Sequence, residues 1–277
     1  MQRIFISLFL SIFLFGGGCV AINKNPIQNS NNGVTGTTVS LPASSENITV
    51  NSPLTNDAVD NPIHVTGEAR VFENVVSWRL LDVDKNILTS GTTEAAAPDM
   101  GQFGPFDFYV VVPAVTDKNI TLEVFQASAK DGSDTDLVSI PLALNRIDST
   151  EIKLYFHNNT LDPEITCVKT FAVRQEIVAT QSPARAAMVL LLQGYPDFNG
   201  QETDYYSAIP FRTWLKDISI SADGIATVDF GGAIAGPMGG SCLVGSISAE
   251  IENTLKQFDS VKEVKILIDG EADRLQP

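Results

Sequence analysis

The segment Phe106-Asp-Phe-Tyr-Val-Val-Val112 decides the fold of the first half of this 277-residue chain. Its apolar residues recur at every second position from Phe106 onward, and Asp107 and Tyr109 fall between them. A period of two residues is that of a β-strand with one buried face, because successive side chains of a strand point to opposite sides. The segment therefore predicts a strand that packs on a core along one side.

Further alternating runs surround this segment between residues 47 and 147. They are short, they are bracketed by turn residues such as Ser52-Pro53 and Gly67, and they show no helical period. Runs of this kind favour an all-β sandwich, with Trp78 as a candidate anchor of its core. The runs are Ile48–Val50, Ile63–Val65, Val75–Val83, Ile120–Val124 and Val138–Leu144.

The second half of the chain, residues 150–277, mixes strand and helix patterns. Ser182-Pro183 is typical of a helix start, and Asp223-Gly224 between two apolar runs is typical of a hairpin. The order strand, strand, helix, hairpin, helix, strand predicts an α+β domain, a mixed sheet with two helices on one face. The expected strands are Ile152–His157, Phe171–Ile177, Trp214–Ser221, Ile225–Phe230 and Val264–Ile268.

Two of these elements are expected to have one solvated face. In the first strand, Lys153, Tyr155 and His157 alternate with apolar residues and should face water. The second helix carries apolar residues at helical spacing, with polar residues on the other side. Its apolar set is Leu243, Ile247, Ile251, Leu255 and Phe258, and its polar set is Glu250, Glu252, Asn253 and Lys256.

The first nineteen residues have the pattern of a secretory signal peptide. Arg3 precedes an apolar run, Ile4–Phe15, whose helix of about 18 Å is too short to cross a hydrocarbon core of ~30 Å. Three glycines then precede Cys19, which resembles the lipobox of bacterial lipoproteins, although Gly16 stands where that motif usually has Leu. The resemblance implies that Cys19 is acylated and becomes the mature N-terminus. Cleavage after Ala21 and an uncleaved anchor are the alternatives.

These patterns predict the organisation of the chain and its location. A signal peptide covers residues 1–18, and residues 19–46 form a flexible tether, because Asn, Ser, Thr and Gly dominate there without a period. The sandwich follows at 47–147 and the α+β domain at 150–277. We expect an extracytoplasmic protein that is anchored to the bacterial cell membrane as a lipoprotein.

The formal net charge of −15 restricts the possible partners. Residues 47–147 carry 14 acidic and 6 basic side chains, and residues 148–277 carry 18 and 10, so the acidity is spread evenly. The lack of a basic stripe argues against nucleic acid as a partner, and the same field repels anionic lipid headgroups. Attachment to the membrane is therefore expected through the N-terminus.

Cysteine is sparse in this chain. If Cys19 is acylated, Cys167 and Cys242 remain as an even pair in an oxidising compartment. Such a pair favours a disulfide bond, and two buried free thiols are the alternative.

Two families share motifs with this chain. The motifs Ile48–Pro53, Pro62–Arg70, Phe72-Glu73, Gly104–Phe106 and Ser128–Ser133 resemble the immunoglobulin-like domain of bacterial spore germination over nearly all of 47–144. The motifs Ile152–Phe156, Arg174, Ile209-Pro210, Ala226–Phe230, Ile251–Leu255 and Val264–Gly270 resemble the sporulation and spore germination domain called GerMN over about 150–270. Both families occur in envelope lipoproteins without an established catalytic centre. The resemblance implies an immunoglobulin-like sandwich followed by a GerMN-like domain in a protein that is not an enzyme.

Motifs of catalysis and cofactor binding are missing. His64 and His157 lie far apart in the sequence and fit ordinary strand or surface positions, and Gly231–Gly236 fails the dinucleotide fingerprint because residue 233 is Ala. We expect no cofactor and no metal site. The acidic loop Asp131–Asp136 gathers three carboxylates, which fit either a weak calcium site or a polar turn.

A polar segment with several aromatic rings is the candidate binding site. Tyr195, Phe198, Tyr205 and Tyr206 lie within residues 195–207, where they fit either a partner-binding loop or core packing. The leading hypothesis is a non-catalytic, lipid-anchored module that binds or assembles with envelope proteins. The alternative is a protein that binds cell-wall glycan (peptidoglycan), for which aromatic platforms are the usual signature, and an undetected enzyme is a third possibility.

Overall fold

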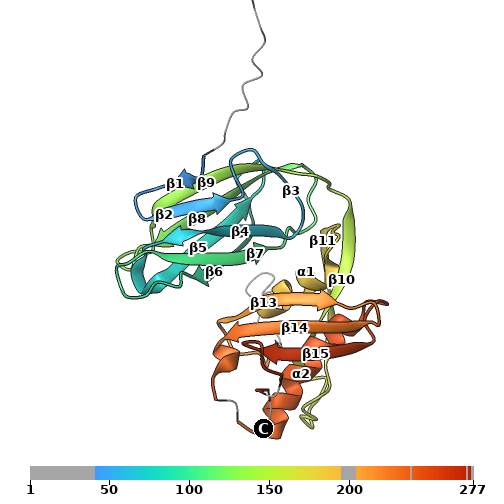
Figure 1. Cartoon of the computed structure of the whole chain (residues 1–277). Helices are drawn as coiled ribbons and strands as arrows, with labels where there is room; N and C mark the ends of the chain where they lie inside the picture. Colours follow the sequence, from blue (N-terminus) through green and yellow to red (C-terminus); the bar gives the residue numbers. More distant parts are fainter. Residues whose placement is uncertain (1–40, 195–203, 238, 273, 276–277) are drawn as a thin grey trace, which may run out of the picture. The chain divides into compact units, whose positions relative to one another are not determined.

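The computed structural model describes residues 41–194, 204–237, 239–272 and 274–275. The predicted signal peptide and most of the predicted tether lie outside these residues. Within them the chain folds as an all-β sandwich followed by an α+β part, so the predicted fold class is confirmed (Figure 1).

The sandwich consists of two sheets. One has the strand order β1–β2–β4–β7 and is antiparallel throughout, and the other has the order β3–β9–β8–β5–β6 and is antiparallel except for the pair β3–β9. The strands are β1 (Ala43–Ser44), β2 (Ile48–Ser52), β3 (Ala58–Val59), β4 (Ile63–Ala69), β5 (Val75–Leu81), β6 (Ile87–Glu94), β7 (Gly104–Val110), β8 (Asn119–Ala127) and β9 (Asp134–Leu144).

Alternating side chains of the two sheets form the core of the sandwich. Along β4, every second residue from Ile63 to Ala69 is buried, as expected for a strand with one face on a core. Trp78 is 3% exposed and its ring stacks on Phe108 at 5.6 Å between centroids, so its predicted role as a core anchor is confirmed.

The α+β part divides its strands between two small sheets, so the expected α+β class holds but the expected single mixed sheet was wrong. The first has the order β11–β10–β12 and is antiparallel, and the second has the order β13–β14–β15, with β14 and β15 parallel. Helices α1 and α2 pack against each other and against strands of both sheets. No helix among the described residues is long and apolar enough to cross a membrane. The elements are β10 (Ser149–Asn158), β11 (Phe171–Val178), α1 (Pro183–Leu192), β12 (Tyr205–Tyr206), β13 (Thr213–Ile220), β14 (Ile225–Gly232), α2 (Ser241–Lys256) and β15 (Glu263–Ile268).

Two expectations about solvated faces were wrong. Glu250 of α2 is fully buried, whereas Leu243 is 37% exposed, because the segment that follows β12 covers α2 on the side of Glu250. His157, at the end of β10, is 3% exposed rather than facing water, because the loop before β11 and α2 both close over it.

A short hydrogen-bonded segment joins the sandwich to the α+β part. The N–H of Val178 in β11 donates to the carbonyl of Val112 at 3.0 Å. The buried carboxamide of Asn61 accepts from the N–H of Val112 at 2.8 Å and donates to the carbonyl of Val178 at 2.6 Å. Val111 belongs to the core of the α+β part, and Val112 belongs to the core of the sandwich. The change from one core to the other therefore takes place between two adjacent residues.

The predicted disulfide bond is present between Cys167 and Cys242. It joins the loop between β10 and β11 to the first turn of α2, which are 75 residues apart in the sequence.

Replacing both cysteines by alanine (Cys167→Ala with Cys242→Ala) should lower the free energy of unfolding by on the order of 4 kcal/mol, because closure of a loop of this length restricts the unfolded chain. Urea unfolding of the wild type and of this double variant measures the difference. Thiol labelling of the denatured, unreduced wild type provides the check, since two reactive thiols at these positions would contradict the bond.

Candidate functional site

A groove opens where the sandwich meets the α+β part. Its volume is about 510 Å³, and residues of β5, β6 and β7 line one side while residues of α1, β13 and the turn before β13 line the other. This volume lies within the range of roughly 300–1,000 Å³ that is typical of ligand sites. The aromatic rings that line it among the described residues are Trp78, Phe108, Tyr109, Phe211 and Trp214.

Both tryptophans of the chain line this groove, and each lies opposite a glycine of the neighbouring strand. Trp78 pairs with Gly91 across β5 and β6, and Trp214 pairs with Gly231 across β13 and β14. A Cβ atom on Gly91 would lie 2.6 Å from Cζ2 of Trp78, and one on Gly231 would lie 2.7 Å from Nε1 of Trp214. The glycines therefore allow each indole ring to lie across the adjacent strand.

Charged and hydrogen-bonding groups accompany the rings. Arg212, whose φ is 66°, forms an ion pair with Glu94, with 3.2 Å between Nη1 and Oε1. Oδ1 of Asp107 lies 2.7 Å from Nε2 of His64, which is exposed. No described residue accepts a hydrogen bond from either indole N–H. The groove thus combines ring faces, donors and carboxylates.

A second candidate surface is the loop of residues 159–170, which we call the clamped loop. Besides the disulfide, the carbonyl of Cys167 accepts a hydrogen bond from the hydroxyl of Ser246 at 2.7 Å. At the start of the loop, Oδ1 of Asn158 accepts hydrogen bonds from the N–H groups of Thr160 and Leu161 at 3.0 and 2.9 Å. These contacts fix the loop at both of its ends.

Asp162 holds the middle of the clamped loop together. Oδ2 of its carboxylate accepts hydrogen bonds from the N–H and the hydroxyl of Thr166 at 2.9 and 2.8 Å. The hydrogen bond from the Thr166 N–H is the largest of the effects that lower the pKa of Asp162, so the ionised form is favoured. Ile165, between these contacts, has a φ of 51°, which is rare for a β-branched residue. The loop therefore has a specified conformation.

Large apolar side chains are exposed on this rigid support. Ile165 and Val168 are each 60% exposed, and a Cβ atom on Gly245 would lie 3.5 Å from Cγ1 of Val168, which places Val168 beside α2. The disulfide between Cys167 and Cys242 brings the loop to the first turn of α2, which carries a further exposed apolar side chain. Exposed apolar side chains on a fixed surface mark interaction sites in many proteins. We call the set the apolar face; it consists of Leu161, Ile165 and Val168 in the clamped loop and Leu243 in the first turn of α2.

A buried titratable pair lies beneath the clamped loop. Nε2 of His157 lies 3.5 Å from Oε1 of Glu250 and 3.2 Å from the carbonyl oxygen of Ser246, and Nδ1 lies 3.0 Å from the carbonyl oxygen of Lys169. A neutral imidazole donates to only one of these two carbonyls. Burial raises the pKa of Glu250 to about 7, although hydrogen bonds from Ser207 and Ala208 favour its charged form.

The aromatic residues predicted as a binding site are only partly described. Cys19, Tyr195 and Phe198 lie outside the described residues. Tyr205 is half-buried and packs against the core of the α+β part, whereas Tyr206 is 38% exposed and its ring stacks on His157 at 5.4 Å between centroids. Since the His157 ring also contacts the clamped loop, Tyr206 lies near that loop. Its role in partner binding stays a prediction.

The acidic loop Asp131–Asp136 does not gather its carboxylates at one point. Each carboxylate has its own hydrogen-bond or ion-pair partner. One stabilises the turn, and the other two contact residues elsewhere in the sandwich. In the described part of the chain, no group of three or more His, Cys, Asp or Glu residues is placed to hold a metal ion. The partners of Asp131, Asp134 and Asp136 are Ser133, Arg79 and Asn47, respectively.

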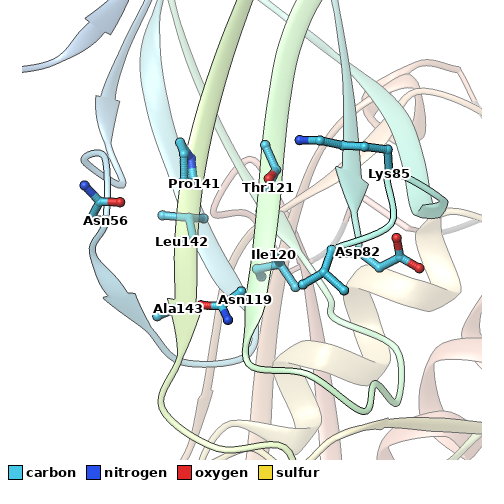
Figure 2. Close-up of a pocket in the computed structure, with 10 residues that line it drawn as sticks. Asn56, Asp82, Lys85, Asn119, Ile120, Thr121, Pro141, Leu142 and Ala143 are labelled. Carbon is cyan, nitrogen blue, oxygen red and sulfur yellow. The ribbon is translucent and has the colours of Figure 1, made fainter.

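The sandwich contains a smaller pocket of about 180 Å³ along β8 and β9 (Figure 2). Asp82 and Lys85 lie at one side of it, and its described lining has no aromatic ring. The carboxylate of Asp82 is engaged by Asn86, whose side-chain hydrogen bond is the largest of the effects that lower the pKa of Asp82. Because the Asp82 carboxylate already accepts hydrogen bonds within the turn between β5 and β6, the groove and the apolar face are better candidates for a binding site.

Neither of these surfaces was predicted from the sequence. The exposed aliphatic residues of the clamped loop lie next to Cys167 in the sequence. Because a disulfide was expected at Cys167, it could have indicated a rigid surface loop around these residues. The groove depends on Trp214 and on the pairing of each tryptophan with a glycine, and strand register cannot be read from composition.

The stability of the protein should depend on pH through Glu250. Its pKa is about 7 in the folded protein against 4.5 as an ordinary value, so the stability gained from its proton is fully present below pH ~4.5 and is lost as pH rises through ~7. The loss is on the order of 3 kcal/mol. Glu250→Gln should remove this dependence in urea unfolding between pH 4.5 and 8.

The control for this experiment is Glu252→Gln on the same helix, where the carboxylate is exposed and pairs with Lys256 at 2.6 Å. This control should keep the pH dependence of the wild type. Identical pH profiles for the wild type and Glu250→Gln would contradict the assignment.

Comparisons with known proteins agree with this architecture. Residues 47–133 match the family model described as the immunoglobulin-like domain of bacterial spore germination, and residues 153–274 match the one described as sporulation and spore germination. No curated protein matches the chain.

Two solved structures of the sporulation protein GerM from Bacillus subtilis are similar to part of the chain. The structure of its tandem GerMN domains has 23% identity and a TM-score of 0.36, and the match covers 44% of this chain and 40% of that one. The structure of its first GerMN domain has 22% identity and a TM-score of 0.31, with 44% and 85% covered. The family matches show that this chain belongs to the proteins in which an immunoglobulin-like domain of bacterial spore germination is followed by a sporulation and spore germination domain.

Proposed function

We propose that this protein is a non-catalytic, lipid-anchored, extracytoplasmic module of the bacterial cell envelope that binds or assembles with protein partners. The observation that carries the proposal is the apolar face, in which aliphatic side chains are exposed on a loop held by a disulfide and by partly buried hydrogen bonds. The matching families are named for sporulation and spore germination, and neither description names a reaction.

The physical argument concerns the cost of binding. Exposed Leu, Ile and Val side chains lose contact with water when a partner covers them, which favours association. A loop that already has its bound conformation loses little conformational entropy in the process. The clamped loop also carries exposed charged side chains, Glu164 and Lys169, and interfaces commonly combine apolar side chains with polar ones.

Attachment to the membrane through Cys19 completes the proposal. The apolar run and the three glycines before this cysteine support acylation, and an acylated cysteine with more than one chain anchors stably. Cys19→Ser should therefore release the protein into the soluble extracytoplasmic fraction. Fractionation of cells after a high-salt wash measures this, and a variant that stays in the membrane would contradict the lipid anchor.

The apolar face can be tested apart from the anchor. Ile165→Ser with Val168→Ser should reduce in-cell cross-linking to partner proteins about tenfold or more, because the loss of interface anchors costs about 2 kcal/mol or more. The melting temperature should change little, since both side chains are exposed.

The matched control is Val83→Ser with Ile87→Ser, which removes side chains of similar exposure (51% and 60%) from the sandwich. Cross-linking by the control should equal that of the wild type. Equal losses in both double variants, or no loss in either, would count against a role of the apolar face.

A further inference from the structure

The groove between the sandwich and the α+β part has features that the proposed protein-binding function does not use. It contains both tryptophans of the chain, and its two sides come from the two different families. Phe211 at its edge is 81% exposed and Trp214 is 48% exposed, although large aromatic side chains are normally covered. A bound ligand would cover them.

We propose that this groove binds a short neutral oligosaccharide. A sugar ring has an apolar face of C–H groups and a rim of hydroxyls, so it requires an aromatic surface with hydrogen-bonding groups beside it. Trp214 supplies an exposed ring, and its indole N–H has no acceptor among the described residues. Carboxylates of Glu94 and Asp107 and the guanidinium of Arg212 accept from and donate to hydroxyls.

The fixed positions of the rings favour this ligand. Gly231 allows the indole of Trp214 to lie across β14, and an exposed, fixed ring is a surface on which a sugar ring can stack. Trp78 is buried and stacks on Phe108, so it supports the floor of the groove. Arg212 adopts a left-handed backbone conformation and is held by Glu94. Strained residues of this kind cluster at ligand sites, where the surrounding structure maintains them.

Charge selects a neutral ligand over an anionic one. The protein has a formal net charge of −15, and the described lining of the groove includes Glu94 and Asp107 against Arg212. A polyanion such as a nucleic acid or a phosphate-rich polymer is repelled by this field. A neutral sugar avoids this repulsion and still forms hydrogen bonds with charged groups.

Tryptophan fluorescence tests the proposal directly, since both tryptophans of the mature protein lie in the groove. We expect titration with the β-1,4-linked tetramer of N-acetylglucosamine to change the emission in a saturable way, with a Kd below about 1 mM, the value that corresponds to roughly −4 kcal/mol. The affinity should vary little between 50 and 500 mM NaCl, because a neutral ligand displaces no counterions. No saturable change up to 10 mM tetramer would overturn the proposal, and a steep salt dependence would overturn the assignment of a neutral ligand.

Variants locate the binding site. Trp214→Ala and, separately, Phe211→Ala should weaken binding of the tetramer at least tenfold by calorimetry, whereas Phe72→Ala, which removes a 58% exposed ring elsewhere on the sandwich, should leave it unchanged. Phe211 is so exposed that its replacement should not affect folding, which circular dichroism checks. Binding by both groove variants with the affinity of the wild type would overturn the site. Binding of an apolar peptide without any binding of the tetramer would overturn the proposed ligand.

Discussion

The carboxamide of Asn61 is the interaction on which the arrangement of the two halves depends. It is buried, it accepts from the N–H of Val112, and it donates to the carbonyl of Val178, so one side chain joins the end of the sandwich to β11. The backbone of Asn61 takes part as well, since its carbonyl accepts from the hydroxyl of Thr180. A buried amide that lost either partner would leave a polar group unsatisfied, at a cost of about 1–3 kcal/mol. This network therefore holds the two walls of the groove together.

Much of the fold follows from residue order alone. The period of two along Phe106–Val112 and Ile63–Val65 predicted the sandwich, and Asp223-Gly224 predicted the hairpin of β13 and β14, because each of these signals acts locally. The burial of Glu250 and His157 did not follow, since it results from a distant segment and from the clamped loop closing over them. Tertiary contacts decided those two residues against their local pattern.

The two candidate surfaces differ in how much of them a sequence can reveal. The apolar face depends on a loop and on a disulfide, and both partners of the bond were identified from the cysteine count. The groove depends on the register that places Trp78 opposite Gly91 and Trp214 opposite Gly231, and on the contact of two domains. The proposed roles of the two surfaces therefore rest on different kinds of contact, exposed aliphatic side chains in one and aromatic rings with charged groups in the other.

Site-specific photo-cross-linking in the native cells tests whether the apolar face contacts a partner protein. A photoreactive amino acid at position 168, in the apolar face, should form a covalent adduct with a discrete partner protein, because Val168 is 60% exposed next to the disulfide that fixes the clamped loop. The same amino acid at position 87 on the sandwich should form no such adduct. A reagent at position 168 that yields no adduct, or the same adducts as position 87, would contradict the account of this protein as an assembly module of the envelope.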